Sequence, residues 1–224
     1  MKAIILAAGK GKRMRPLTMR KPKPLVRVRG KTFLEHILNA LPSSVDEIII
    51  VIGYKGKMIK GFLGNSYRGK KIIYVVNDKI NLGTAHSLLL TKQYFKKSER
   101  FLLIYADELP TKKEVVHCLK NKFSWLTKYY DKPEESAVVT LARGRIVDVE
   151  EKPKNPKSNF VVGGLMVINS DIFKYRPIKH RNGEYYITSM MKKFIKTHRV
   201  MSVRGRDNLS FSTKAEIDKF NKNY

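Results

Sequence analysis

The chain has 224 residues and carries 46 Lys and Arg residues against 19 Asp and Glu, a formal net charge of +27. This length suffices for one sizeable core, and the single cysteine, Cys118, excludes an intrachain disulfide and a cysteine-based metal cluster. No stretch approaches the roughly 20 apolar residues of a membrane span, so we expect a cytoplasmic protein without membrane contact. The charge favours polyanionic partners: nucleotides, phosphosugars or nucleic acid.

The N-terminal stretch begins with an apolar run over residues 3–8 that predicts a short buried strand of the parallel-sheet type. The run ends at Gly9, and the loop after it contains Gly11, Arg13 and other cations. Glycines let backbone N–H groups approach a ligand closely, and arginine supplies a forked, permanently charged set of donors. The loop is therefore suited to a phosphate chain, although Met14 stands where a dinucleotide-binding fingerprint needs its third glycine.

The first half of the chain alternates between predicted strands and helices. Strands are predicted over 3–8, 47–53, 71–77 and 100–107, and helices over 33–41, over 56–63, from 83 and over 112–122. This order predicts an α/β fold with a Rossmann-like mixed, mostly parallel sheet sandwiched by helices. Ligands of such sheets bind beyond the carboxyl ends of the strands, where the Gly9 loop and Asp107 both fall.

The regular alternation of strands and helices ends in the second half of the chain. Short strands are predicted over 136–142, 145–150, 160–169 and 200–203, with a hairpin at Arg143-Gly144 and a helix over 185–196. Thr213 and Glu216 have the spacing of a capping box, which predicts a last helix through Phe220. We expect one domain over 1–224, in which residues 136–205 form a smaller mixed lobe.

Residues 6–18 read LAAGKGKRMRPLT, and residues 21–25 read KPKPL. This pattern resembles the signature of the sugar-1-phosphate nucleotidylyltransferases, also called NDP-sugar pyrophosphorylases. The resemblance extends from Met1 to about Lys219. It implies the nucleotide-diphospho-sugar transferase fold, with a nucleotide-binding half over 1–125 and a sugar-phosphate-binding lobe over 136–205.

The resemblance implies roles for residues of the first half. The backbone from Leu6 to Gly9 would meet the base and ribose, Arg13 the leaving β- and γ-phosphates, and Lys23 the α-phosphate. Asn77 and the Gly83-Thr84 pair are similar to the segment that reads the base, although an ordinary strand–turn–helix connection has the same pattern. The implied nucleotide-binding set is Leu6, Ala7, Ala8, Gly9, Gly11, Arg13, Lys23, Asn77, Gly83 and Thr84.

The acceptor side rests on the motif EEKP at residues 150–153, which is closest to that of glucose-1-phosphate thymidylyltransferases. In the resemblance, Glu151 accepts hydrogen bonds from sugar hydroxyls and Lys152 provides a point charge for the sugar phosphate. Val162 and Gly164 lie on the next strand, where a missing side chain lets a pyranose approach. Glu184 is a further sugar contact. A plain hairpin and helix start would give the same pattern.

Asp107 ends an apolar strand and is the predicted ligand of Mg²⁺, which prefers oxygen donors. The family supplies a second carboxylate near the C-terminus, but this chain has Ser210 there, or Ser212 on a shifted alignment. Either Glu108 or Asp207 compensates, or the metal rests on Asp107 and phosphates alone.

The implied activity is transfer of a nucleotidyl group from an NTP to a sugar 1-phosphate, with Arg13, Lys23 and Asp107 as catalytic residues. A phosphoalcohol acceptor, the identity of the base and a homo-oligomeric state remain open. Ser210 motivates one alternative, a nucleotide-sugar-binding protein with weakened catalysis. The net charge alone motivates another, a basic nucleic-acid-binding protein; no interleaved aromatic and basic motif supports it.

Overall fold

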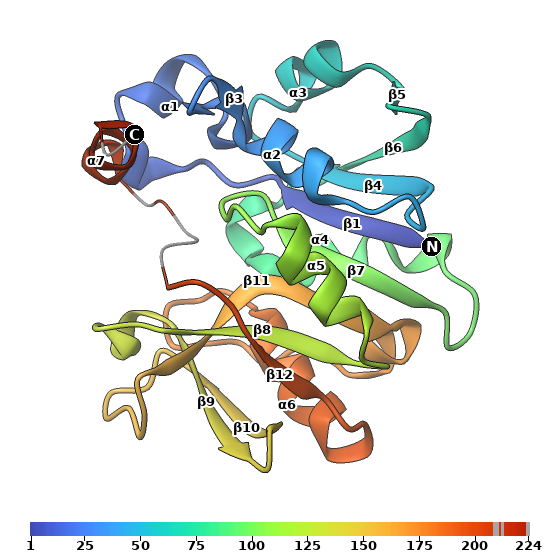
Figure 1. Cartoon of the computed structure of the whole chain (residues 1–224), viewed down its shortest axis with the longest axis vertical. Helices are drawn as coiled ribbons and strands as arrows, with labels where there is room; N and C mark the ends of the chain where they lie inside the picture. Colours follow the sequence, from blue (N-terminus) through green and yellow to red (C-terminus); the bar gives the residue numbers. More distant parts are fainter. Residues whose placement is uncertain (208–210, 212, 223–224) are drawn as a thin grey trace.

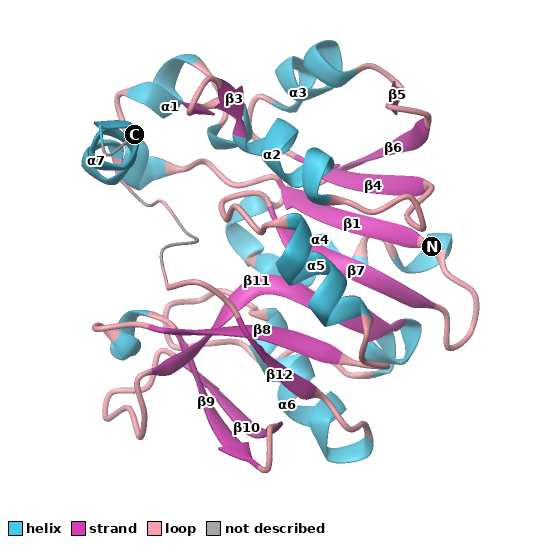
Figure 2. Ribbon diagram, in the orientation of Figure 1, coloured by secondary structure: helices cyan, strands magenta, loops and turns pink. Residues whose placement is uncertain are grey.

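The computed structural model describes residues 1–207, 211 and 213–222. Within these residues, ten strands form one sheet in the order β5-β6-β4-β1-β7-β11-β8-β12-β10-β9, and β2 and β3 form a separate two-stranded sheet (Figures 1 and 2). The strands are β1 (Lys2–Ala7), β2 (Arg27–Val28), β3 (Lys31–Thr32), β4 (Glu47–Ile52), β5 (Ser66–Tyr67), β6 (Lys70–Val76), β7 (Arg100–Tyr105), β8 (Ser124–Tyr129), β9 (Ala137–Ala142), β10 (Arg145–Glu151), β11 (Phe160–Asn169) and β12 (Met201–Arg204). The α-helices are α1 (Leu17–Arg20), α2 (Phe33–Ala40), α3 (Gly56–Leu63), α4 (Thr84–Leu89), α5 (Lys112–Leu119), α6 (Ile187–Thr197) and α7 (Lys214–Lys222).

Four parallel strands form the first half of the main sheet, in the order β6-β4-β1-β7. The chain moves from β1 outward to β4 and β6, and then returns to the other side of β1 to form β7. The strand order therefore reverses between β1 and β7. Ligands of open α/β sheets bind at such a switch point, beyond the carboxyl ends of the two strands.

Both faces of β1, β4 and β7 are buried, which explains their continuous apolar sequences, whereas β6 is buried only in part. Ala3, Ile5 and Ala7 of β1 pack in one cluster with residues of α2, α3 and α5. Ile4 packs on the other face, in a cluster that includes residues of α4 and α6. The predicted sandwich of helices around an α/β sheet is confirmed.

Strand β11 joins the two halves of the sheet, because it pairs antiparallel with β7 on one side and with β8 on the other. Its pairing with β8 shifts register between Val162 and Met166. A Cβ atom at Gly164 would lie 2.6 Å from the Cβ of Tyr105, so this crossing requires a glycine. The second half adds mostly antiparallel pairs, and the sheet as a whole is mixed.

The C-terminal segment returns to the first half of the molecule, where α7 lies beside the region of α1 (Figure 1). Phe211 and Ile217 are buried in a cluster with Met14 and Phe33, and the rings of Phe33 and Phe211 meet edge to face at 5.9 Å. This contact supports the loop after β1. The predicted capping box is confirmed, since Thr213 and Glu216 exchange both hydrogen bonds.

The sequence analysis missed β8, whose first five residues are all buried. Other differences are small: β7 ends at Tyr105, before Asp107, and α5 ends at Leu119. The division into a nucleotide-binding half and a sugar-phosphate lobe remains a prediction. Among the described residues, no helix is long and apolar enough to cross a membrane.

Candidate active site

A cleft opens at the switch point between β1 and β7, and it consists of two adjoining cavities. The first, of about 330 Å³, is lined mainly by the loop after β1 and the residues after β7. The second, of about 250 Å³, extends toward β8, β10 and β11. The residues that line both are Arg13, Thr84, Tyr105 and Asp107.

The loop after β1 is shaped by Gly11, which adopts a left-handed conformation with φ of 59°. The Thr18 hydroxyl donates a hydrogen bond of 2.9 Å to the Gly11 carbonyl, and a Cβ at Gly11 would lie 3.1 Å from the Cβ of Lys23. Gly9 differs, because a Cβ there would meet no atom within 4 Å. The loop is thus packed tightly against the Lys23 segment at Gly11 and open to a ligand at Gly9. The first cavity is lined by Leu6, Ala7, Gly9 and Gly11, while Ala8 is buried in the core beneath it.

Lys23 begins a short 3₁₀ turn between Pro22 and Pro24. Its Nζ lies 3.3 Å from Oδ2 of Asp107. The Lys23 side chain is only 10% exposed, whereas that of Asp107 is 45% exposed at the cleft. Two of the three predicted catalytic residues, Lys23 and Asp107, therefore meet across the switch point.

The charge state of Asp107 follows from its surroundings. Loss of water around the carboxyl group works to raise its pKa, but the positive charges of Lys23, Lys128 and Arg13 outweigh this effect. The pKa of Asp107 consequently lies below its usual range. At neutral pH the cleft therefore presents an ionised carboxylate beside several cations.

Thr84 begins α4, and Asn77 and Gly83 precede this helix in the chain. The Asn77 amide donates to Ser87 Oγ at 2.8 Å and its oxygen accepts from the Lys79 N–H at 2.9 Å. Gly83 has φ of 88°, and a Cβ there would lie 2.6 Å from the Tyr185 carbonyl oxygen. Neither Asn77 nor Gly83 is among the described residues that line the cleft, whereas Thr84 lines both cavities.

Three of the predicted sugar-phosphate residues line the second cavity: Glu151, Val162 and Gly164. Glu151 accepts a hydrogen bond of 2.5 Å from the Thr188 hydroxyl. Burial raises the pKa of Glu151, and the contacts with Thr188 and Lys152 oppose that rise only in part. Glu151 is thus a shielded acceptor placed within the cavity.

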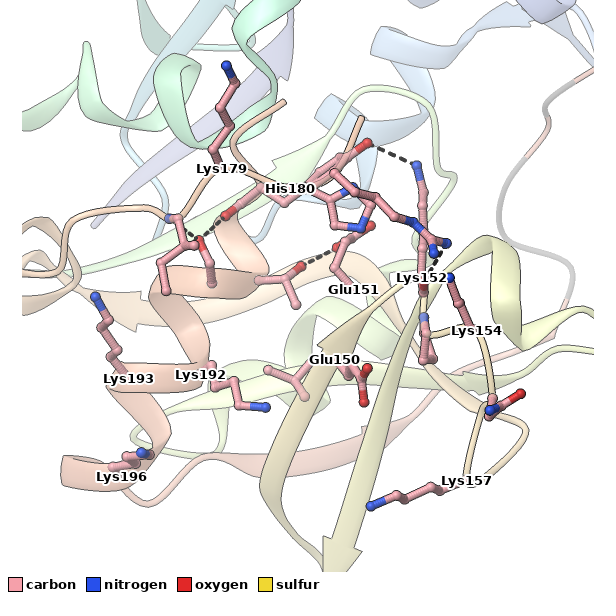
Figure 3. Close-up of a pocket in the computed structure, with 18 residues that line it drawn as sticks. Glu150, Glu151, Lys152, Lys154, Lys157, Lys179, His180, Lys192, Lys193 and Lys196 are labelled. Carbon is pink, nitrogen blue, oxygen red and sulfur yellow. Dashed lines mark hydrogen bonds between the residues drawn. The ribbon is translucent and has the colours of Figure 1, made fainter. Parts of the chain in front are cut away.

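Lys152 and Glu184 lie elsewhere. Lys152 has φ of 45°, and its Nζ donates to the Tyr186 hydroxyl at 3.0 Å and lies 4.8 Å from the centre of that ring. It lines a third cavity of about 850 Å³, which we call the outer cavity (Figure 3). Tyr186 lines both the outer cavity and the second cavity of the cleft. Glu184 instead packs beside Gly83 in the turn before α6 and is not among the described residues that line the cleft.

Sequence reasoning missed a buried ion pair at the base of the second cavity. Glu108 Oε1 lies 3.3 Å from Lys128 Nζ, and Glu108 Oε2 accepts a hydrogen bond of 2.6 Å from the Gly164 N–H. Burial raises the pKa of Glu108, while Lys128 acts in the opposite direction. Lys128 could not have been found, because it lies on the unpredicted strand β8.

Glu108 and Asp207 are the two candidates to replace a second metal carboxylate. The Glu108 carboxylate already pairs with Lys128 and accepts a hydrogen bond from the Gly164 N–H. Asp207 Oδ1 accepts a hydrogen bond of 2.9 Å from the Tyr129 N–H and pairs with Arg204 at 2.6 Å. Ser210 and Ser212 lie outside the described residues. Within the described part of the chain, no group of three or more His, Cys, Asp or Glu side chains could hold a metal ion.

Comparison with known proteins gives a consistent result. The family model described as "Nucleotidyl transferase" matches residues 2–208. The bifunctional protein GlmU of Methanocaldococcus jannaschii is 34% identical over 208 residues, which cover 91% of this chain and 49% of that protein. The UTP–glucose-1-phosphate uridylyltransferase AglF of Haloferax volcanii is 32% identical over 212 residues, which cover 90% of this chain and 86% of that protein.

Solved structures agree with these matches. A protein of Bacillus anthracis assigned as a glucose-1-phosphate thymidylyltransferase, solved with sucrose, superposes with a TM-score of 0.85 at 27% identity, covering 99% of this chain and 94% of that one. A UDP-glucose pyrophosphorylase with UDP-glucose has a TM-score of 0.83 at 21% identity, which shows the fold alone. The chain spans about half the length of the GlmU proteins that it matches.

Proposed function

The chain belongs to the nucleotidyl transferase family, and we propose that it joins an NTP to a sugar 1-phosphate, giving an NDP-sugar and pyrophosphate. The observation that carries the proposal is the Lys23–Asp107 pair, which lies at the switch point. One side of this pair opens to the glycine loop and the other to the cavity lined by Glu151 and Gly164. Such a cleft has room for a phosphate chain and a sugar in line.

In the proposed reaction, a phosphate oxygen of the sugar 1-phosphate attacks the α-phosphorus of the NTP. The bond from that phosphorus to the oxygen that bridges to the β-phosphate breaks, and pyrophosphate leaves with the electron pair. The attacking oxygen is already ionised at neutral pH, so no general base is needed. Catalysis then consists of positioning and neutralising charge, for which Arg13 and Lys23 are placed beside the first cavity.

Lys23 is suited to the α-phosphate because its ammonium is mostly buried and held by one carboxylate. An incoming phosphate would share this ammonium with Asp107. Arg13 is exposed on the 3₁₀ turn Lys12–Met14, where its fork can reach the β- and γ-phosphates. The proposed nucleotide-binding side of the cleft is completed by Thr84, Gly9 and Gly11.

The acceptor would lie in the second cavity, with its hydroxyls toward Glu151 and its ring across Gly164. Lys152 would have to leave the Tyr186 hydroxyl to reach the sugar phosphate, and its flexible four-carbon stem permits this movement. Tyr186 lines both cavities, so the path between the two positions is short. Glu184 retains its proposed sugar contact only if the turn before α6 moves.

Asp107 is the proposed Mg²⁺ ligand. Its carboxylate is ionised, partly exposed and directed to the cleft, which fits a cation that is held by one or two carboxylates together with substrate phosphates. When bound, Mg²⁺ would neutralise charge on the phosphate chain. We further propose that the protein acts in the cytoplasm, where its nucleotide substrate is found.

The names of the relatives narrow the substrates to be tested. AglF is a UTP–glucose-1-phosphate uridylyltransferase, and the Bacillus anthracis neighbour is assigned to thymidylyl transfer to glucose 1-phosphate. We therefore infer a pyrimidine nucleotide, UTP or dTTP, and a hexose 1-phosphate.

The test is release of pyrophosphate with Mg²⁺ across a panel of ATP, GTP, CTP, UTP and dTTP, each with several sugar 1-phosphates. We expect release that requires both substrates and is lost in Lys23→Ala. Lys21→Ala is the matched control, because Lys21 is exposed and two residues away. Absence of release for every pair would contradict the proposal, and nucleotide binding without release would support a binding protein of the same fold.

A further inference from the structure

The outer cavity lies beyond the Glu151–Thr188 hydrogen bond, away from the Lys23–Asp107 pair. It is lined by the end of β10, the loop that follows to Lys157, residues 178–181 and one face of α6 (Figure 3). Eight Lys and Arg side chains line it, against the two carboxylates of Glu150 and Glu151. The proposed reaction uses only one of these cations, Lys152.

Four of the lysines have no role inside the molecule. Lys154, Lys157, Lys179 and Lys196 are exposed, and among the described residues no hydrogen bond or ion pair holds their ammonium groups. By contrast, Lys192 pairs with Asp148 at 3.1 Å. Figure 3 shows Lys154 and Lys157 on the loop at one side of the hollow and the α6 lysines at the other.

This arrangement is electrostatically unfavourable without a ligand. Like charges from the loop after β10 and from α6 face one concave surface, while the Lys179 side chain points away from them (Figure 3), and a low-dielectric concave wall strengthens the combined potential of the lysines that face it. A ligand with several negative groups would offset the repulsion. The unpaired lysines stand on different segments, so a compact ligand with a chain of charges matches them better than a single anion does.

The size of the hollow favours a small molecule. Its volume of about 850 Å³ lies within the range of small-molecule sites. Ile178 is 59% exposed and, with Tyr186, supplies an apolar part of the lining among the charges. A nucleic acid would instead track an extended basic surface with interleaved aromatic side chains.

We propose that the outer cavity is a second binding site, for a small polyanion that carries a chain of two or more phosphates. Two kinds of molecule carry such a chain of phosphates: inorganic polyphosphate and nucleotides. The outer cavity adjoins the second cavity of the cleft, because Glu151, Tyr186 and Thr188 line both, but neither Lys23 nor Asp107 lines it. The proposal goes beyond nucleotidyl transfer and does not depend on it.

The probe is inorganic tripolyphosphate, titrated calorimetrically at about 0.1 M salt. We expect two classes of site in the unmodified protein, one of which is lost in Arg13→Ala/Lys23→Ala. The variant Lys154→Gln/Lys157→Gln/Lys196→Gln should weaken the other class about tenfold or more, since three surface charge contacts are removed. The matched control is Lys31→Gln/Lys57→Gln/Lys113→Gln, which removes three exposed lysines elsewhere and should change affinity less than twofold.

Equal losses in these two triple variants would overturn the proposal, because the binding would then follow net charge alone. So would tighter binding of a 20-nucleotide single strand that displaces tripolyphosphate from the same class of site. Repeating the titration with ATP separates the sources: equal affinity identifies the phosphate chain, and tighter binding of ATP identifies a nucleotide. A protein that lacks nucleotidyl-transfer activity would still bind tripolyphosphate in the outer cavity. Failure of the proposed reaction and failure of the proposed second site are therefore distinguishable.

Discussion

The ammonium of Lys23 lies 3.3 Å from the carboxylate of Asp107, although the two residues are 84 positions apart in the chain. Lys23 follows β1 and Asp107 follows β7, on opposite sides of the point where the strand order reverses. The fold thus brings a buried cation and a partly exposed carboxylate together before any ligand binds. In the proposed reaction an incoming phosphate shares the Lys23 ammonium with Asp107, so the pair is central to the proposal.

The first prediction concerns the pKa of Asp107. In the native protein Lys23 helps to hold it below its usual range. Lys23→Met should raise it, because the loss of water around the carboxyl group then acts with less opposition. The measurement is an NMR titration of the Asp107 carboxyl carbon, with Lys21→Met as the control. An unchanged Asp107 titration in Lys23→Met would show that the two charges do not interact in solution.

The second prediction concerns the buried Glu108–Lys128 pair. Glu108→Met should lower the free energy of unfolding by about 3 kcal/mol, because it removes a buried partner from a buried charge. Adding Lys128→Met should recover most of the loss. Urea unfolding of the two single variants and the double variant measures this. Additive losses in the double variant would mean that the residues act independently.

The third prediction compares two glycines in or beside helices. Gly83→Ala should be strongly destabilising, since its φ is 88° and a Cβ would lie 2.6 Å from the Tyr185 carbonyl oxygen. Gly61→Ala, within α3, meets no atom within 4 Å and should stabilise the protein by about 0.5–1 kcal/mol. Thermal unfolding distinguishes them. Similar small effects at both positions would contradict the close packing of α4 against Tyr185.

The fourth prediction concerns Tyr186, whose hydroxyl binds the Lys152 ammonium at 3.0 Å. Tyr186→Phe should lower the KM for the sugar phosphate several-fold with little change in kcat, because Lys152 is then released for the substrate. The ring contact with Lys152 is retained in this variant. Steady-state kinetics with Lys152→Ala as reference provides the test. A higher KM in Tyr186→Phe would mean that the hydroxyl itself contacts the acceptor.

Much of the fold could be predicted because β1, β4 and β7 are buried on both faces and β6, although only partly buried, keeps an apolar run. Their apolar runs mark β1, β4, β6 and β7 directly. The family resemblance carried by residues 6–25 is confirmed by the match over residues 2–208. The apolar runs and the family motif are each contained in short stretches of sequence, and they can therefore be found in a single sequence.

Strand β8 illustrates what could not be predicted. Its sequence, SWLTKY, places three polar residues at buried positions, so neither apolar continuity nor alternation is visible. Each bonds to a residue outside β8: Ser124 donates to the Cys118 carbonyl six residues earlier, Thr127 binds Ser202, and Lys128 pairs with Glu108. Those partners are known only once the chain has folded.

The site shows the same limit. The position of Lys152 away from the cleft depends on Tyr186, 34 residues later, and the need for glycine at 83 depends on Tyr185. No local pattern contains either relationship. The outer cavity, which combines three separate segments, is likewise a product of the tertiary structure.

In the proposed reaction, a sugar phosphate oxygen attacks the α-phosphorus of a nucleotide in the cleft beside Lys23 and Asp107. The most direct measurement is ³¹P NMR of the reaction with a sugar 1-phosphate whose phosphate oxygens carry ¹⁸O. We expect that an NDP-sugar forms, that all of the label stays in it, and that the pyrophosphate is unlabelled, as this attack requires. Label in the pyrophosphate, or consumption of the NTP without an NDP-sugar, would contradict it.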